Sequence, residues 1–204
     1  MKWFKKPEIQ MMASTFAAFE TIHAASYSYL EESLGIQNYE AFNGLNDNKK
    51  GTIRIIKMSA WVILLLLTKQ LIYGALMAGH KAANVAATWP TINGQWIPAG
   101  LTSKDGFFLN AVNNTIWIHF IHRGLAYLLL VLIVVYSLKL FRINGNAFWN
   151  LMRRMPLTFV LFQVALGIFT VLSSAQIVPG VWAGFEWLAQ LHQLVGMLLL
   201  LSVV

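Results

Sequence analysis

The sequence predicts an all-α membrane protein in which four transmembrane helices form one bundle, preceded by a soluble amphipathic helix. Apolar side chains make up 57% of the 204 residues, charged side chains make up only 11%, and the mean hydropathy is +0.59. Every long apolar run lies after residue 48. Water-soluble domains carry about 25% charged residues, so this composition excludes an ordinary soluble protein.

The charge is divided unevenly along the chain. Residues 1–48 carry three basic and six acidic groups, net −3, whereas residues 49–204 carry 12 basic and two acidic groups, net +10. We therefore expect a soluble helical segment over 1–48 and a four-helix membrane domain over 49–204. The chain has no cysteine. Disulfides, thiolate metal sites and thiol catalysis are thus excluded, and a cofactor must be held by His, carboxylate or Met.

The soluble helix is predicted over residues 7–34. Pro7 suits a first helical turn, and Gly35 suits the position just after a helix end. Within it, Glu20 and His23 are spaced i, i+3 and share one face, and Tyr27 lies one turn further along that face. Di-iron carboxylate bundles use the same spacing, although a solitary Glu-x-x-His is also typical of a solvated pair.

Four later stretches are long enough to cross a bilayer, which takes about 20 apolar residues. They are residues 55–79, 115–140, 155–175 and 187–204. Lys and Arg gather before the first stretch and between the second and third, at Lys49, Lys50, Arg54, Lys57, Lys139, Arg142, Arg153 and Arg154. The positive-inside rule predicts that these ends and the N-terminus are cytoplasmic, and it explains the basic residues without a nucleic-acid partner. The membrane we expect is a bacterial inner membrane.

The membrane domain has the pattern of one helical hairpin used twice. The first and third stretches each contain a Gln followed four positions later by Gly, and the second and fourth each contain a Trp five positions before a His. These residues are Gln70, Gly74, Gln163 and Gly167, and Trp117, His122, Trp187 and His192. With an interfacial Trp in each helix, both imidazoles are expected about 7.5 Å further into the membrane, at matching depth.

Two histidines at equal depth in a four-helix bundle suit a porphyrin iron, which takes one axial imidazole from each side. The alternative is that each His only forms a hydrogen bond to another helix. Zinc is a weaker alternative, since no further ligands are visible at that depth.

Three further polar residues of the predicted membrane helices have two interpretations each. His119 shares the face of His122 and is either a rival ligand or an interfacial hydrogen-bond donor. Arg123 either pairs with a heme propionate or extends to the outer surface. Lys69, in the middle of the first stretch, faces either a polar interior or an absent partner.

Residues 49–204 resemble the carboxy-terminal half of heme A synthase. The resemblance rests on residues 69–79, Thr-Trp-Pro at 88–90, Asn-Gly-Gln-Trp-Ile-Pro at 93–98, His-Arg-Gly-Leu-Ala-Tyr at 122–127 and His-Gln at 192–193. It implies an eight-helix family built of two four-helix halves, which oxidises the C8 methyl of heme O to the formyl of heme A. His122 and His192 stand at the positions of the axial ligands of a heme b cofactor.

The same resemblance implies that the catalytic amino-terminal half is absent here. The chain would then supply only the cofactor half, and its partners would be heme, membrane lipid and a missing half or second copy. No catalytic residue is assigned, because Asp105 and Glu186 suit loop and interface positions better than that of the missing acid. Whether the chain is an enzyme on its own stays open.

Residues 1–45 resemble a fragment of the radical-bearing small subunit of class I ribonucleotide reductase. This implies iron ligands at Glu20 and His23 and a radical at Tyr27. The sequence has no second Glu-x-x-His, so an iron site would need another chain. The alternatives to a heme A synthase-like protein are a cytochrome b-type electron carrier without catalysis, an iron module with a membrane anchor, and a non-functional chimera of the two fragments.

Overall fold

The four predicted membrane helices are present. The computed structural model describes residues 47–101, 106–178 and 180–203, and its long helices are α3 (Asp47–Gly79), α5 (Thr115–Leu140), α7 (Met155–Ser173) and α8 (Gly184–Val203). Four stretches are long and apolar enough to cross a membrane: Gly51–Gly79, Thr115–Leu140, Ala147–Gln176 and Gly184–Val203. Among the described residues no strand forms, so the prediction of an all-α membrane protein is confirmed.

The chain divides into two compact units, one of residues 1–55 with residue 204 and one of residues 56–203. The second unit contains everything discussed below. The soluble helix predicted over residues 7–34, with Glu20, His23 and Tyr27, lies outside the described residues.

Short elements connect the long helices: η1 (Ala82–Ala86), η2 (Ala99–Leu101), α4 (Phe107–Asn113), α6 (Ala147–Met152) and η3 (Ser174–Gln176). The hydropathy pattern predicted neither α4 nor α6. The side chain of Asn114 starts α5, because its Oδ1 accepts hydrogen bonds from the backbone N–H groups of Ile116 and Trp117 at 3.0 and 3.3 Å. Pro156 occupies the first turn of α7, where its missing N–H leaves no helical bond unmade.

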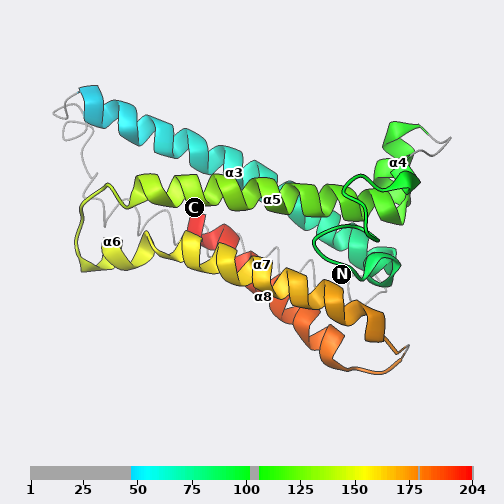
Figure 1. Cartoon of the computed structure of the whole chain (residues 1–204). Coiled ribbons are helices and arrows are strands. Elements are labelled where there is room, and N and C mark those ends of the chain that lie inside the picture. Colours follow the sequence, from blue (N-terminus) through cyan, green and yellow to red (C-terminus); the bar gives the residue numbers. More distant parts are fainter. Residues whose placement is uncertain (1–46, 102–105, 179, 204) are drawn as a thin grey trace, which may run out of the picture. The chain divides into compact units, whose positions relative to one another are not determined.

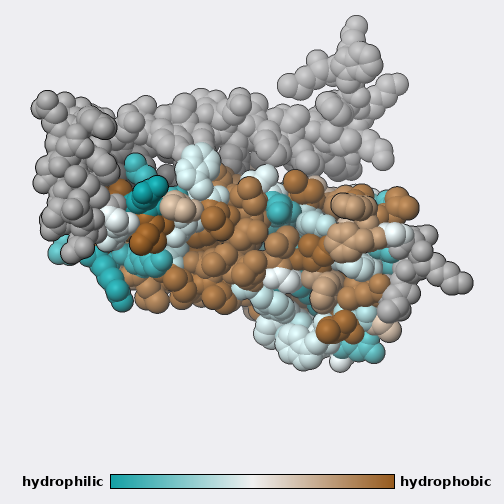
Figure 2. Space-filling view, turned by 90° about the horizontal axis from the view of Figure 1, so that it is seen from above, coloured by the Kyte–Doolittle hydropathy of each residue, from teal (hydrophilic) through white to brown (hydrophobic). Residues whose placement is uncertain are grey.

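The α7–α8 hairpin forms the largest helix–helix contact of the unit, and α5 packs along α7 (Figure 1). The buried core comes from all four long helices and includes Ile63, Ile118, Ile133, Val160 and Leu199. Many large apolar side chains stay exposed on the outside of these helices, and Figure 2 shows hydrophobic residues covering the middle of one face. Such a surface fits lipid rather than water.

Lys69 lies on the exposed surface of α3. It shares that surface with Leu65, which is 57% exposed, and Ile72, which is 55% exposed. The prediction that this ammonium group faces a polar interior is therefore wrong for the described unit. The alternative, that it faces an absent partner, stays a prediction.

Candidate functional site

The sequence repeat becomes a pair of matched side-chain clusters. In the first, Gln70 of α3 lies beside His122 of α5, and Gln70 Nε2 is 3.3 Å from His122 Nε2. In the second, Gln163 of α7 lies beside His192 of α8, and the same two atoms are again 3.3 Å apart. The structure thus gives each of the two histidines predicted from the sequence the same partner.

Each cluster has a glycine against its imidazole. A Cβ atom at Gly74 would lie 3.7 Å from His122 Cε1, which is an ordinary contact. A Cβ atom at Gly167 would lie only 3.0 Å from His192 Cε1, so that neighbour would have to move. Gln and Gly are four residues apart and so face the same neighbouring helix, which explains why one helix supplies both the hydrogen bond and the space.

Four polar atoms of these clusters are buried and have no hydrogen-bond partner. They are Oε1 of Gln70, Oε1 of Gln163, Nδ1 of His122 and Nδ1 of His192. A buried polar atom without a partner costs about 1–3 kcal/mol, so such atoms are uncommon in folded proteins. Here they occur in two matched pairs around the two imidazoles.

The donor set fits a heme iron. It consists of two imidazoles from two helices of a membrane bundle, each packed against a glycine of a neighbouring helix, and a bis-imidazole heme takes its two ligands from residues of this kind. Among the described residues no group of three or more His, Cys, Asp or Glu side chains forms. A zinc site, which needs three or four such ligands, finds no support there.

His119 is engaged elsewhere. Its side chain is fully buried, and its Nε2 lies 2.7 Å from the carbonyl oxygen of Ala82. A carbonyl can only accept, so Nε2 must donate, and Nδ1 is left to accept from an Arg123 Nη2 atom 3.5 Å away. His119 therefore fills the hydrogen-bonding role that was one of its two predicted interpretations.

Arg123 holds the loop between α3 and α5. Its guanidinium donates to three loop carbonyls: those of Thr88 at 2.8 Å, Thr91 at 3.0 Å and Ala86 at 2.6 Å. The hydroxyl of Tyr127 donates to the carbonyl of Pro90 at 3.1 Å. Sequence reasoning placed Arg123 at a heme propionate or at the outer surface and missed these contacts. Pairing with a propionate stays a prediction.

The same loop is held at two further places. The Trp117 indole N–H donates to the carbonyl of Leu101 at 3.2 Å, and the hydroxyl of Ser174 donates to the carbonyl of Ala83 at 2.8 Å. Residues 82–101 are thus a folded cap docked on α5 and on the end of α7. The Trp-Pro motif that carried the family resemblance lies within this cap.

Replacing Arg123 with alanine is expected to loosen the cap. Three carbonyls would lose a charged donor, and we expect the free energy of unfolding to fall by about 2–3 kcal/mol. Limited proteolysis within residues 82–101 and thermal unfolding in detergent would measure this. Arg142→Ala is the matched control, because Arg142 is exposed. Equal cleavage rates in the two variants would contradict a holding role for Arg123.

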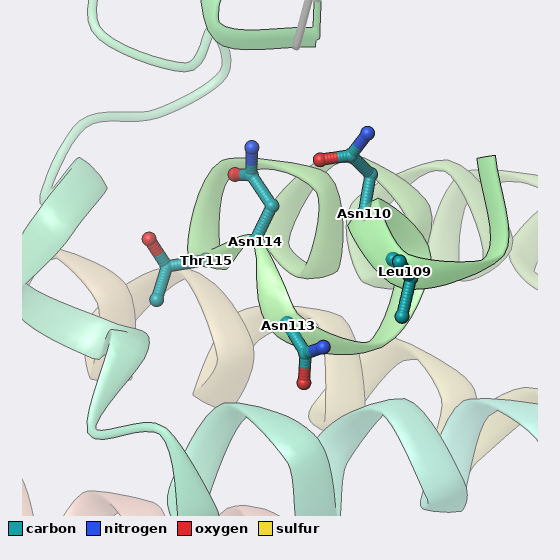
Figure 3. A pocket seen from close by; sticks show the side chains of 5 residues that line it. All are labelled: Leu109, Asn110, Asn113, Asn114 and Thr115. Atoms are coloured by element: carbon teal, nitrogen blue, oxygen red, sulfur yellow. The ribbon is translucent and has the colours of Figure 1, made fainter. Parts of the chain in front are cut away.

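A polar pocket lies at the junction of α4 and α5 and is lined by Leu109, Asn110, Asn113, Asn114 and Thr115 (Figure 3). Its polar groups are amides and one hydroxyl, none of which titrates near neutral pH. Asn114 already caps α5. The pocket offers hydrogen bonding but no group for acid–base or metal chemistry.

Glu186 also has a structural task. Its Oε2 accepts a hydrogen bond from the backbone N–H of Ala183 at 2.8 Å, just before α8 begins. This agrees with the interface position expected for it. Asp105, the other acidic residue considered above, lies outside the described residues.

A family model and individual relatives all match this chain to the same protein family. A family model described as cytochrome oxidase assembly protein (COX15-CtaA) matches residues 12–204. The heme A synthase of Bartonella henselae is 31% identical over 135 residues, covering 65% of this chain and 37% of the relative. The heme A synthase of Wolbachia pipientis subsp. Culex pipiens is 39% identical over 116 residues, covering 55% of this chain and 32% of the relative.

A third relative, the heme A synthase of Pelagibacter ubique, is 31% identical over 154 residues, covering 76% of this chain and 42% of the relative. The matched parts amount to 32–42% of these relatives' lengths. No solved structure matches the chain. The family match begins at residue 12 and so includes part of the segment predicted to resemble ribonucleotide reductase, a resemblance that stays a prediction.

Proposed function

The chain belongs to the family of cytochrome oxidase assembly proteins, and on that premise we propose that it takes part in heme A biosynthesis as a membrane protein that binds heme b. His122 and His192 are the axial ligands in this proposal. The observation that carries it is the matched pair of clusters, each with one imidazole, one Gln amide, one glycine and two buried unpaired polar atoms.

Each part of the site has a separate task. The imidazoles of His122 and His192 supply the ligand nitrogens, and Gly74 and Gly167 let the two rings pack closely against α3 and α7. Arg123 and His119 hold the cap of residues 82–101 against α5. When bound, heme b would supply a one-electron redox couple.

In the wider reaction, the oxidation of heme O to heme A, this chain supplies the cofactor half. It spans 37% of the Bartonella henselae relative, and the described acid Glu186 is used as a helix cap. We propose a catalytic half, in a separate chain or in a second copy, as its partner. In this proposal the end of the bundle between α5 and α7 faces the cytoplasm of a bacterium, together with the N-terminus, and the basic residues between α5 and α7 support this by the positive-inside rule.

A second candidate function is electron transfer by a cytochrome b-type carrier. It is favoured by the position of Glu186, whose carboxylate caps α8 and so leaves no described carboxylate beside the two imidazoles. Two imidazoles alone are sufficient for a redox couple. Heme O oxidation needs more than these residues, whereas electron transfer does not.

Two measurements test the proposal. The purified chain is expected to show the absorption spectrum of a low-spin bis-imidazole heme, with about one heme per chain. Pigment analysis after coexpression with a heme O-producing enzyme then separates the two candidates: heme A made by this chain alone favours the enzyme, and heme b without heme A favours the carrier. A chain that takes up no heme would refute both.

A further inference from the structure

Lys69 is a charged residue that has no task in the function proposed above. It lies in α3, within the stretch Gly51–Gly79 that is long and apolar enough to cross a membrane. Its side chain is exposed, and no hydrogen bond or ion pair joins it to the described part of the chain. An ammonium group without a partner is costly in the hydrocarbon region, and in membrane proteins such groups pair with one another or with carbonyls.

The depth of Lys69 keeps its ammonium group away from both membrane surfaces. Lys57, near the basic end of the membrane stretch, lies 12 residues before it, and Gly79, at the other end of α3, lies 10 residues after it. At about 1.5 Å per residue, these separations come to about 18 Å and 15 Å. The four-carbon stem of lysine reaches only about 6 Å, so the ammonium group does not extend to water or to lipid headgroups. Its partner must lie inside the membrane.

Lys69 points away from the side of α3 that packs on the other helices. Ile63 and Leu67 are buried, and Gln70 lies beside His122, so these residues mark the inner side of α3. Large apolar side chains that are each more than half exposed lie on the opposite side: Met58, Trp61, Leu65 and Ile72. With Lys69 they are spaced three or four residues apart, which puts all five on one face, here called the Lys69 stripe.

We propose that the Lys69 stripe is the docking surface for a transmembrane helix of another protein that carries an Asp or Glu at mid-membrane depth. Charge complementarity selects this partner, because a carboxylate attracts an ammonium group strongly in a medium of low dielectric constant, whereas a lipid tail offers it no polar atom. The apolar residues of the stripe would pack against the same helix. The closely packed pairs of long helices are α7 with α8 and α5 with α7, so α3 is free to take a further neighbour.

A second copy of the membrane part of this chain does not supply such a carboxylate. Residues 49–204 contain two acidic residues, Asp105 and Glu186. Asp105 precedes the stretch Thr115–Leu140 and belongs to no membrane stretch. Glu186 lies in the first turn of α8 and accepts a hydrogen bond from the backbone N–H of Ala183. Neither stands at the depth of Lys69, so the helix we propose belongs to a different chain.

The test uses the full-length chain in liposomes with a synthetic transmembrane peptide made of leucine residues around one central glutamate. Energy transfer between a dye on each partner measures their association. We expect this peptide to bind about 3- to 30-fold more tightly than the same peptide with a central glutamine, the range of polar contacts between membrane helices. Lys69→Met is expected to remove the preference. Lys57→Met is the matched control, because Lys57 is also exposed on α3, and it is expected to keep the preference.

A charge swap separates ion pairing from a change in helix packing. Lys69→Glu is expected to prefer a peptide with a central lysine over the peptide with a central glutamate. Equal binding of the glutamate and glutamine peptides by the unsubstituted chain would overturn the inference, and so would a preference that persists in Lys69→Met.

The oligomeric state tests the rival occupant. If the chain is a dimer in detergent by sedimentation equilibrium and Lys69→Met makes it a monomer, a second copy occupies the stripe and the inference is overturned. The inference goes beyond the proposed function, because it holds whether or not the chain binds heme. A chain that takes up no heme but prefers the glutamate peptide would refute the proposed function alone, so the two failures are distinguishable.

Discussion

Replacing His192 with alanine is expected to remove heme from the chain, with a loss of affinity of about 100-fold or more. Changes to groups that only support a metal ligand cost about 10- to 100-fold in affinity, so loss of the ligand itself belongs at or beyond the upper end of that range. His122→Ala is expected to do the same. Heme per protein by pyridine hemochrome assay, together with the low-spin absorption bands, would measure the loss.

Two other histidines serve as controls for this result. His80 is exposed, with its Nδ1 near the carbonyl of Leu76, and His80→Ala is expected to keep full heme content. His119→Ala is expected to keep the low-spin heme spectrum while loosening the cap, because its Nε2 is bonded to Ala82. Heme retained in both His122→Ala and His192→Ala, or lost only in His119→Ala, would show that the ligands are misassigned.

The four membrane helices could be predicted from the sequence because crossing a bilayer sets a length and a polarity that can be counted along the chain. Helix α5 has the predicted bounds of 115 and 140. The short helices α4 and α6 could not be found in this way, since six or seven residues next to a longer apolar run give no separate signal.

The matched positions of the two histidines were also predictable, because the repeat gives both the same spacing from a Trp. Their immediate partners were not. Gln70 and Gln163 were part of the repeat, but which residue a helix turns toward its neighbour depends on its rotation in the bundle, and the sequence gives no such rotation. The four-residue spacing from Gln to Gly was the available signal, since it places both on one face.

The cap shows a second limit of sequence reasoning. Arg123 and His119 look like polar residues inside an apolar helix, and a membrane segment of that kind suggests a ligand or a path to the surface. In the fold they bind backbone carbonyls of residues 82–91, which are about 30 to 40 positions away along the chain. Carbonyls carry no sequence signature, so partners of this kind appear only in the structure.

Replacing Gly167 with alanine is expected to damage the site, whereas replacing Gly74 with alanine is expected to be almost harmless. The new methyl group at 167 would lie 3.0 Å from His192 Cε1, in the closely packed α7–α8 hairpin. Forcing an extra carbon into a packed core costs about 1–3 kcal/mol, and the atom that must move here belongs to a proposed ligand. We therefore expect lower heme occupancy and a lower unfolding temperature.

The two substitutions add the same methyl group at matched places of the repeat, so the difference between them isolates the contact with the ring. At Gly74 the methyl group would lie 3.7 Å from His122 Cε1, and alanine also favours the helix by about 1 kcal/mol over glycine. Gly74→Ala should thus unfold at the same or a higher temperature and keep its heme. If both variants lose heme equally, the space beside the two rings is equally tight once heme is bound; if neither does, the ring of His192 is free to move and its position is not set by α7.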